Sequence, residues 1–383
     1  HYPGFSGSLY SPSDYYRFND LFIDTNSKLT PEDQLKLFID TAHENKLKVI
    51  MDLVINHTAI DSPLVKEHPD WYVKDEAGKI KNPGAIHDGK MVLWGDLAEI
   101  DNAASKDIDN LYEFWRKLVM HYLGLGFDGF RCDVAGFVPT DFWNNVRKEL
   151  NAIKQDFMLA EWEARDLHAE AFDMTYGWHW NDVMHKIAMG EADVSALHVY
   201  YSWNEKAYPF DIMRMLFVSN HDKNAWEGTE FEQFGDCLEG AIVLSVISEG
   251  MPLIYNGQEA GNPRRLAFFE KDPIDWQPHP LGDLYKMLFK LKRQNRALWN
   301  ATWGARMINV ANSAPAQVLS FVRQNRRDKV FAVFNLSERP QVFSFSEKLH
   351  YGSYVNYFAG ETIEFAAETK LKLERWEYRV FVR

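Results

Sequence analysis

The chain has 383 residues, of which 46% are hydrophobic and 15% aromatic, and its formal net charge is −13. This length is too great for one ordinary small domain, and a barrel of about 250 residues plus a smaller module fits it. The acidic balance argues against nucleic acid as a partner and is compatible with a neutral substrate. Apolar runs such as 241–247 fall well short of the about 20 residues that cross a membrane, so we expect no membrane segment.

The only two cysteines, Cys132 and Cys237, fall on a predicted strand and a predicted helix. This placement does not indicate a disulfide framework, and unpaired cysteines favour a cytoplasmic location. No signal peptide is visible, although the chain opens at His1 rather than Met, which leaves the location open. The oligomeric state cannot be inferred from these features.

The first predicted helix begins after Thr30, a suitable N-cap that is followed by Pro31 and two acidic residues. Further helices are predicted at about 111–124, 140–153, 234–248 and 284–298. Strands are predicted at 47–57, within 126–135, and at 157–162, 172–176, 213–222 and 251–259. The Val, Ile and Leu run of 47–57 is typical of parallel strands that are covered on both faces.

Between residues 58 and 110 the periodicity disappears, and prolines, glycines and tryptophans predict a long irregular insertion, which is usually functional. After residue 300 the hydrophobic period changes to two, so 318–322, 330–335, 341–345 and 378–382 predict antiparallel strands. The fold class is therefore α/β. We predict a (β/α)8 TIM barrel over 1–300, with an inserted subdomain at about 58–110, and a C-terminal all-β domain over 301–383.

The stretch 126–135 is unusual because an apolar strand carries Arg131 and Asp133 two residues apart. Alternate residues of a strand point to the same face, so these two side chains should pair. A fixed guanidinium keeps a carboxylate ionised, which suits a nucleophile, although a structural ion pair is the more frequent explanation of the pattern taken alone. Asp52, in the middle of another apolar strand, needs a cationic partner, and Arg131 is our candidate.

Three carboxylates, Asp133, Glu161 and Asp222, lie at or near the C-terminal ends of three predicted parallel strands. Each has a simpler explanation by itself, since Glu161 could be a solvated charge and Asp222 could cap the next helix. Together at one barrel mouth, they suggest one carboxylate that attacks, one that exchanges protons and one that supports a positive charge. This division of labour describes the cleavage of a glycosidic bond.

The chain also resembles the α-amylase family of glycoside hydrolases, essentially over its whole length. The matching segments, in chain order, are Tyr10 with Asp14-Tyr15-Tyr16, 52–57, 129–133, Glu161, 219–222 and 250–259. The resemblance implies that Asp133 is the nucleophile, Glu161 the general acid/base, and Asp222 a residue that binds sugar hydroxyls and stabilises the transition state. It also implies that Arg131 orients Asp133 and that Tyr10, His57 and His221 line the subsite of the reacting sugar. We predict that Asp52 contacts Arg131 rather than substrate and so acts as an orienter.

Some segments depart from the family pattern. Many α-amylases have a Lys-His pair where this chain has Gly136 and Phe137, which changes the expected contacts to the leaving group. Calcium is a possible cofactor, because Asn56 and Asp96 match two of its ligand positions and offer the oxygen atoms that calcium prefers. Val134 resembles members that act on α-1,6 bonds. Trp71, Trp94 and Trp162 are candidate sugar platforms, although core packing explains each as well.

The function we predict is a retaining glycosidase that hydrolyses α-glucosidic bonds, chiefly α-1,4, of starch- or glycogen-type glucans or malto-oligosaccharides. A 4-α-glucanotransferase or maltosyltransferase with the same covalent intermediate is the nearest alternative. A non-catalytic relative, such as the ectodomain of a transporter subunit, is a further one. Such relatives lose the carboxylates, whereas this chain has all three.

The six predicted parallel strands are two fewer than a (β/α)8 barrel requires. The family pattern places the Tyr10 loop directly after the second strand, which makes the strand at 47–57 the third. We therefore expect the native gene to encode the first two βα units, roughly 60 residues, before His1.

Overall fold

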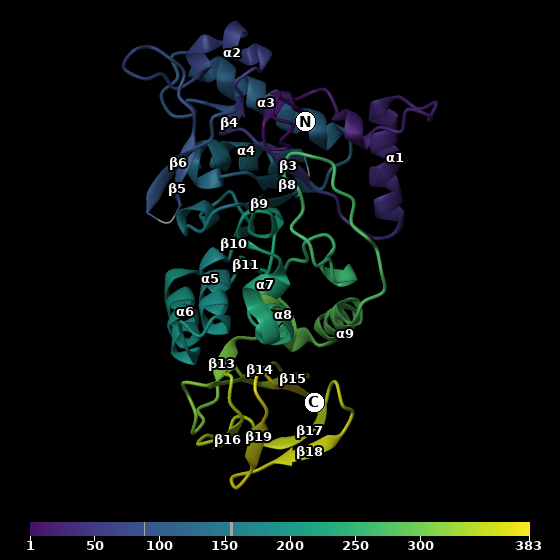
Figure 1. Ribbon diagram of the computed structural model, residues 1–383, viewed down its shortest axis with the longest axis vertical. Coiled ribbons are helices and arrows are strands. Elements are labelled where there is room, and N and C mark those ends of the chain that lie inside the picture. The colour runs from purple at the N-terminus through teal and green to yellow at the C-terminus, as the bar shows by residue number, and fades with distance from the viewer. Residues whose placement is uncertain (88, 154–155) are drawn as a thin grey trace. The chain divides into compact units, whose positions relative to one another are not determined.

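The computed structural model describes residues 1–87, 89–153 and 156–383 (Figure 1). They form two compact units, His1–Tyr176 with Ala267–Lys271 and Gly177–Leu266 with Asp272–Arg383. The predicted domain border between residues 300 and 301 remains a prediction, and each unit is described by itself.

The helices of the first unit are α1 (Pro31–Glu44), α2 (Pro63–Glu67), α3 (Ile108–Gly124) and α4 (Thr140–Ile153). Its strands are β1 (Tyr2–Pro3), β2 (Pro12–Asp14), β3 (Met51–Leu53), β4 (His57–Ala59), β5 (Gly84–His87), β6 (Lys90–Leu93), β7 (Leu97–Glu99), β8 (Gly129–Cys132), β9 (Phe157–Ala160) and β10 (Met174–Tyr176). Short 3-10 turns lie at Asp20–Phe22, Pro69–Trp71, Ala135–Phe137 and Asp166–His168.

Four strands of this unit run parallel in the order β10-β9-β8-β3, and the register sets Asp52 beside Arg131. Helices α3 and α4 share one core with this sheet, and Trp115 and Trp143 are fully buried in it. The predicted apolar face of α3 is confirmed, because the residues spaced three or four apart along it are the buried ones. The N-cap at Thr30 is confirmed too, since its side chain accepts a hydrogen bond from the Asp33 amide.

The strand predicted at 47–57 is wrong in extent. Only Met51–Leu53 pair in the parallel sheet, whereas His57–Ala59 turn away and pair antiparallel with β7. A run of apolar residues indicates that the segment is buried, but it does not show where the hydrogen bonds between strands end. The predicted strand is therefore longer than the observed one. The insertion after β3 is less irregular than predicted, because β4 with β7 and β5 with β6 form two small antiparallel pairs.

The helices of the second unit are α5 (Trp178–Ala188), α6 (Val194–Ala207), α7 (Glu230–Phe234), α8 (Leu238–Ile247) and α9 (Pro280–Gln294). Its strands are β11 (Met213–Leu216), β12 (Met251–Pro252), β13 (Met307–Asn309), β14 (Val318–Gln324), β15 (Lys329–Asn335), β16 (Gln341–Ser344), β17 (Gly352–Asn356), β18 (Thr362–Phe365), β19 (Lys370–Leu373) and β20 (Tyr378–Val382). A π-helical turn follows β11 at Lys223–Glu227, and 3-10 turns lie at Gly235–Cys237, Gln258–Ala260, Arg296–Leu298 and Ala301–Trp303.

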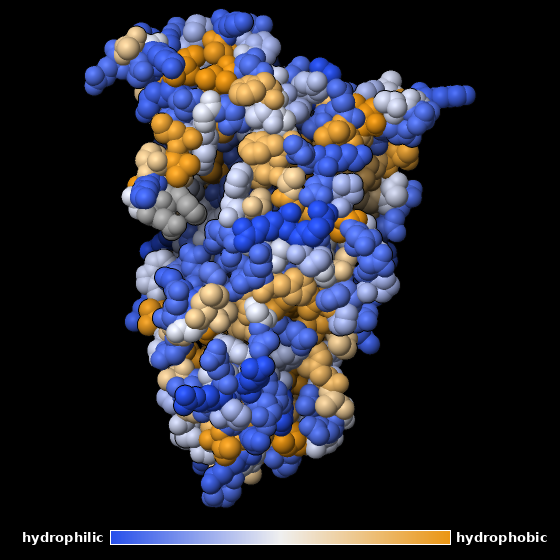
Figure 2. All heavy atoms as spheres, in the orientation of Figure 1, coloured by the Kyte–Doolittle hydropathy of each residue, from blue (hydrophilic) through white to orange (hydrophobic). Residues whose placement is uncertain are grey.

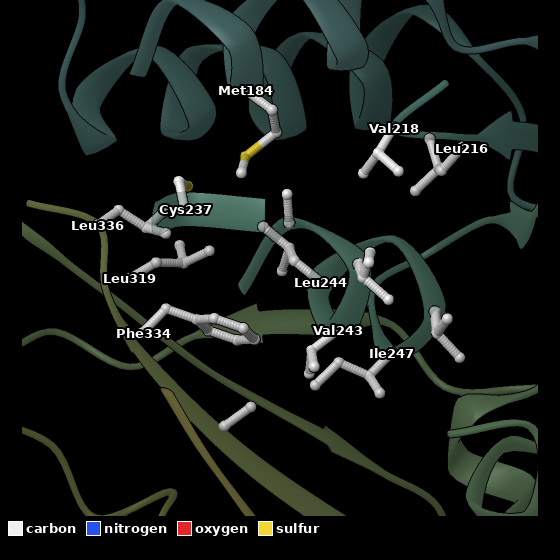
Figure 3. Packing of buried hydrophobic residues seen from close by; sticks show 14 of the residues in the cluster. Met184, Leu216, Val218, Cys237, Val243, Leu244, Ile247, Leu319, Phe334 and Leu336 are labelled. Atoms are coloured by element: carbon white, nitrogen blue, oxygen red, sulfur yellow. The ribbon is translucent and has the colours of Figure 1, made fainter. Parts of the chain in front are cut away.

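Every residue of helix α8 except Glu239 is buried, and this helix is the centre of the second unit's core. Figure 3 shows Val243, Leu244 and Ile247 of α8 among side chains from α5, from the segment of β11 and from the antiparallel strands. A helix that is hydrophobic all round is stable only when it is buried all round. The predicted start at Phe234 is wrong, because Gly235 adopts a φ of 47° and breaks the chain into α7 and α8.

The C-terminal strands confirm the predicted antiparallel pattern. The main sheet has the order β13-β14-β15-β20-β17-β18, and β16 pairs separately with β19. Two buried cations, Lys292 on α9 and Arg323 on β14, lie at the end of α8. Lys292 Nζ donates to the carbonyls of Val246 and Gly250, and Arg323 Nη1 donates to those of Ile247 and Ser248. The last carbonyls of a helix lack partners within it, so these cations satisfy them.

Within the described ranges, β3, β8, β9, β10, β11 and β12 are the strands of parallel type, and each begins inside a predicted strand. Helices α5 and α6 were not predicted. Hydrophilic residues cover most of the surface visible in Figure 2, with apolar ones scattered among them. Among the residues described, no helix is long and apolar enough to cross a membrane.

Candidate active site

Asp133 and Glu161 stand at neighbouring positions of the first unit because β8 and β9 end side by side. The register pairs Cys132 with Ala160, and the ladder continues one step beyond the strands. The Asp133 amide donates to the Leu53 carbonyl at 3.0 Å, and the Glu161 amide donates to the Cys132 carbonyl at 2.9 Å. Polar residues at the carboxyl ends of parallel strands are the usual place for a barrel active site.

Arg131 contacts three carboxylates of this site. Its Nη1 lies 2.8 Å from Asp52 Oδ1 and 2.8 Å from Asp133 Oδ1, and both contacts are hydrogen bonds. Its Nη2 lies 2.8 Å from Glu161 Oε1, as an ion pair in which the N–H does not point at the oxygen. Nε donates to the Tyr176 hydroxyl at 3.2 Å. The predicted pairing of Arg131 with Asp133 and with Asp52 is thus confirmed.

The charge of Arg131 is permanent. Burial lowers its pKa, but the charges of Asp52 and Glu161 outweigh the burial and hold that pKa well above the usual range. One buried guanidinium therefore faces three carboxyl groups. Fully ionised, this cluster carries an excess of negative charge, which favours a positive charge that develops on a ligand beside it.

Asp52 is only half-buried, with 38% of its side chain exposed, and it joins Arg131 to the loop before β2. Its Oδ2 accepts a 2.8 Å hydrogen bond from the Tyr10 hydroxyl. Burial and the charge of Asp52 raise the pKa of Tyr10 well above its usual value, so this hydroxyl keeps its proton and donates. The Tyr10 ring stacks on Phe268 at 6.2 Å between ring centroids.

His57 is buried and neutral. Its Nε2 donates to the Tyr10 carbonyl at 2.9 Å, while Nδ1 faces the Asn56 side-chain amide at 3.3 Å. Burial lowers the pKa of His57 to about 4, against the opposing effects of the Tyr10 carbonyl and of Asp96. Asp133 Oδ2 lies 3.9 Å from Nε2, so a neutral imidazole separates this carboxylate from the Tyr10 loop.

Val134, directly after Asp133, has a φ of 37° and a ψ of 46°. A β-branched residue rarely adopts the left-handed region, and such strain collects at functional sites. The Val134 amide, at the start of this turn, donates a hydrogen bond to Glu161 Oε2 at 2.9 Å. The backbone of the residue after Asp133 thus fixes the carboxylate of Glu161.

His221 and Asp222 belong to the second unit and follow β11. His221 Nε2 lies 3.4 Å from Asp222 Oδ2, and the Asp222 side chain is 36% exposed. The simpler reading of Asp222 as a helix cap is wrong, because its side chain makes no capping hydrogen bond to the turn at Lys223–Glu227. The Asp222 carboxylate is thus partly exposed and faces His221.

The two predicted calcium ligands, Asn56 and Asp96, fit that ion in kind. Both offer side-chain oxygens, and Asn56 is buried with its amide nitrogen directed at His57, which leaves its oxygen for a ligand. In the described part of the chain, however, no three His, Cys, Asp or Glu side chains converge around Asp96. Calcium takes about six to eight oxygens, so backbone carbonyls and water would have to supply the rest.

The prediction from sequence missed three contributors to this site. Tyr176 holds Arg131 Nε, and Tyr15 supports the loop after β3, because its hydroxyl donates to the Val54 carbonyl at 2.9 Å. The third contributor is the Val134 amide. Tyr15 lay within a recognised segment, but no local pattern indicated Tyr176 or the amide.

A pair of neighbouring carboxyl groups is the catalytic equipment that most glycoside hydrolases share. The family profile described as alpha amylase, catalytic domain, matches residues 10–273. The chain belongs to the alpha-amylase family.

Two curated relatives show the range of this similarity. "Alpha-amylase MalA" of Haloarcula japonica is 24% identical over 339 residues, which are 85% of this chain and 48% of that protein. A "4-alpha-glucanotransferase" of Thermotoga maritima is 25% identical over 279 residues, or 66% of this chain and 60% of that protein. The chain spans about half to three fifths of the length of the first curated relatives it matches.

Solved structures agree in fold. The "noncanonic maltogenic alpha-amylase AmyB" from Thermotoga neapolitana has a TM-score of 0.84 and 25% identity, and the match covers all of this chain and 86% of that one. An alpha-amylase from Lactobacillus plantarum gives 0.80 at 23% identity, with 100% and 87% covered. The α/β fold class, with parallel strands and a C-terminal antiparallel sheet, is thus confirmed and is consistent with a TIM barrel.

Proposed function

We propose that the protein is a retaining glycosidase that cleaves α-glucosidic bonds, chiefly α-1,4, of starch- or glycogen-type glucans or malto-oligosaccharides. The single observation that carries this proposal is that Arg131 forms ion pairs with both Asp133 and Glu161, each at 2.8 Å. A carboxylate pair on neighbouring strands can place one group on each side of a glycosidic bond. The alpha-amylases among the relatives support the class of substrate.

In the first step, an Asp133 oxygen attacks the anomeric carbon while the bond from that carbon to the leaving oxygen breaks. The carboxyl of Glu161 gives its proton to the leaving oxygen and becomes a carboxylate. Arg131 keeps Asp133 ionised and aimed, and the Val134 amide holds Glu161 in place. The excess negative charge of the cluster stabilises the oxocarbenium-like state between reactant and covalent intermediate.

In the second step, water gives a proton to Glu161 and its oxygen attacks the anomeric carbon, which releases Asp133 as a carboxylate. The anomeric carbon keeps its original configuration, because it is inverted twice, once in each step. Tyr10 and His57 are proposed to line the subsite of the reacting sugar. Asp222 and His221, after β11, are proposed to bind hydroxyls of that sugar and to stabilise its transition state.

A 4-α-glucanotransferase or maltosyltransferase is the second candidate, because it uses the same intermediate and a sugar hydroxyl in place of water. The Thermotoga maritima relative named as a 4-alpha-glucanotransferase favours it. Product analysis on maltoheptaose separates the two functions. Shorter sugars alone mean hydrolysis, longer ones mean transfer, and the absence of both from the wild-type protein would overturn the proposal.

The remaining expectations join this proposal. Asn56 and Asp96 would contribute two oxygens to a bound calcium ion, which would brace the loop after β3. Calcium should then raise the melting temperature of the wild type but not that of Asp96→Asn. If calcium changes the two melting temperatures equally, Asp96 does not bind the ion. A cytoplasmic location rests on the two cysteines, which are both free and buried.

A further inference from the structure

Tyr176 is buried at the end of β10, beside Glu161. The registers of β8 with β9 and of β9 with β10 place Asp133, Glu161 and Tyr176 at one level of the sheet, one residue beyond the last paired positions. Residues at one level of a parallel sheet point to the same face. The Tyr176 side chain therefore lies on the face that carries the two carboxyl groups.

The Tyr176 hydroxyl is one of the groups that fix the Arg131 guanidinium. Its oxygen accepts a hydrogen bond from Nε at 3.2 Å, while Nη1 donates to Asp52 and to Asp133, each at 2.8 Å. Burial raises the pKa of Tyr176 well above its usual value, so the hydroxyl keeps its proton. A guanidinium is a rigid planar fork, and two fixed nitrogens determine where the third one points.

The third nitrogen, Nη2, faces Glu161 without forming a hydrogen bond. It lies 2.8 Å from Oε1, yet its N–H groups do not point at that oxygen. The attraction is therefore that of two charges, without the additional strength of a straight charge-assisted hydrogen bond. The other oxygen, Oε2, accepts from the Val134 amide at 2.9 Å. A straight bond from Nη2 would thus engage the second oxygen of this carboxylate as well.

Such a bond would make Glu161 a poorer acid. A hydrogen bond to the ionised form of a carboxyl group favours that form. A group that gives its proton to the leaving oxygen does so less readily when its position and protonation state are set against this transfer. The direction in which Nη2 points therefore affects the step that breaks the glycosidic bond. The Tyr176 hydroxyl determines this direction, because it holds Nε.

We propose that Tyr176 is a positioning residue for the acid/base, because its hydroxyl holds the Arg131 guanidinium at an angle that denies Glu161 a straight hydrogen bond. This inference rests on the proposed function and adds a residue to it. Arg131 keeps Asp133 ionised through Nη1 without tying up Glu161 through Nη2. One guanidinium can then serve both a carboxylate that attacks and a carboxyl group that gives a proton.

The test compares two substrates that differ in their need for an acid. The leaving sugar of maltotetraose requires a proton, whereas α-maltosyl fluoride releases fluoride, which does not. The measured quantity is kcat/KM for the fluoride divided by kcat/KM for maltotetraose, a ratio that a loss of folded protein leaves unchanged. Without the hydroxyl, Nη2 turns toward Glu161. Tyr176→Phe should therefore raise the ratio about tenfold, which is part of the roughly 100-fold or larger contribution of a general acid.

A second background shows whether the effect passes through the acid/base. Glu161→Gln removes the acid, so its ratio should exceed that of Tyr176→Phe. Adding Tyr176→Phe to Glu161→Gln should leave the ratio of the single Glu161 variant unchanged. A further tenfold rise in the double variant would overturn the inference, because the hydroxyl would then act by a route that does not include Glu161.

Tyr201→Phe is the matched control, because the Tyr201 hydroxyl also accepts an N–H, that of the Trp180 indole at 3.1 Å, and belongs to α6 of the second unit. Its ratio should equal that of the wild type. A folded Tyr176→Phe with the wild-type ratio would overturn the inference, whereas a wild type that turns over neither substrate would overturn the proposed function instead. If Tyr176→Phe does not fold, Tyr176→Met takes its place, because methionine adapts to irregular space in a core. The wild-type ratio in that variant would equally refute the role of the hydroxyl.

Discussion

Asp52 offers a sharp test of how the site is held together. Asp52→Ala removes two contacts of 2.8 Å, one with Arg131 Nη1 and one with the Tyr10 hydroxyl. A hydrogen bond to a charged group contributes about 1.5–3 kcal/mol, but water replaces part of this loss because the Asp52 side chain is 38% exposed. Arg131 also keeps Asp133 and Glu161 as partners. We expect a loss of about 2 kcal/mol, less than the ~3–5 kcal/mol of breaking a fully buried pair.

This loss should lower the melting temperature by about 2–4 °C and kcat by about 100-fold, because Arg131 and Tyr10 lose their alignment. Asp52→Asn keeps an acceptor for the Tyr10 hydroxyl and should cost only about half as much stability. A double-mutant cycle with Tyr10→Phe should show a coupling of about 1 kcal/mol. Asp283→Ala, which removes an exposed ion pair with Lys286 on α9, is the control and should change neither quantity.

The reasoning fails if Asp52→Ala loses activity while its melting temperature stays at the wild-type value. That result would place Asp52 in contact with substrate rather than behind Arg131. Strict additivity of Asp52→Ala and Tyr10→Phe would refute the link between the strand and the Tyr10 loop.

Further predictions concern the mechanism and the effect of pH. The carboxyl groups of Asp133 and Glu161 should be about 5–5.5 Å apart in a crystal structure, since about 6.5–9.5 Å would indicate inversion. The pKa of His57 is lowered to about 4, so as pH falls the unfolded chain protonates this imidazole before the folded chain does. The free energy of unfolding, measured in urea, should therefore fall as pH drops from about 6.5 to 4, and His57→Gln should make this dependence on pH weaker. Glu230 is the opposite case: burial raises its pKa to about 7, so stability should fall as pH rises from about 4.5 to 7. Glu230→Gln should therefore stabilise the protein at pH 8 but not at pH 4, and equal effects at both would refute the burial argument.

Local patterns in the sequence predicted the parts of the fold and of the site that depend on neighbouring residues. Strand alternation alone predicted that Arg131 and Asp133 share a face, and the period of two predicted the C-terminal strands. The six parallel strands were located correctly, but their lengths were not, because apolar runs continue past the last ladder hydrogen bond. Contacts such as those of Tyr176 with Arg131 join residues far apart in the chain, and no periodicity encodes them.

Two features ran against local preference and were missed for that reason. Val134 adopts a left-handed conformation that β-branched residues avoid, and its amide donates to Glu161. Gly136 looked like the loss of a binding residue, whereas the structure shows that the missing side chain makes room for Trp162. Local rules fail most often at functional sites, where the surrounding fold compensates for the strain.

The central claim is that Asp133 forms a covalent bond with the sugar. A 5-fluoro-glycosyl fluoride reacts with a retaining enzyme and leaves a slowly hydrolysed intermediate, which mass spectrometry of the digested protein can locate. The account predicts one added glycosyl group on the peptide that contains Asp133, and none in Asp133→Asn. A label on Glu161 or elsewhere, or an active enzyme that releases product of inverted configuration without any label, would contradict it.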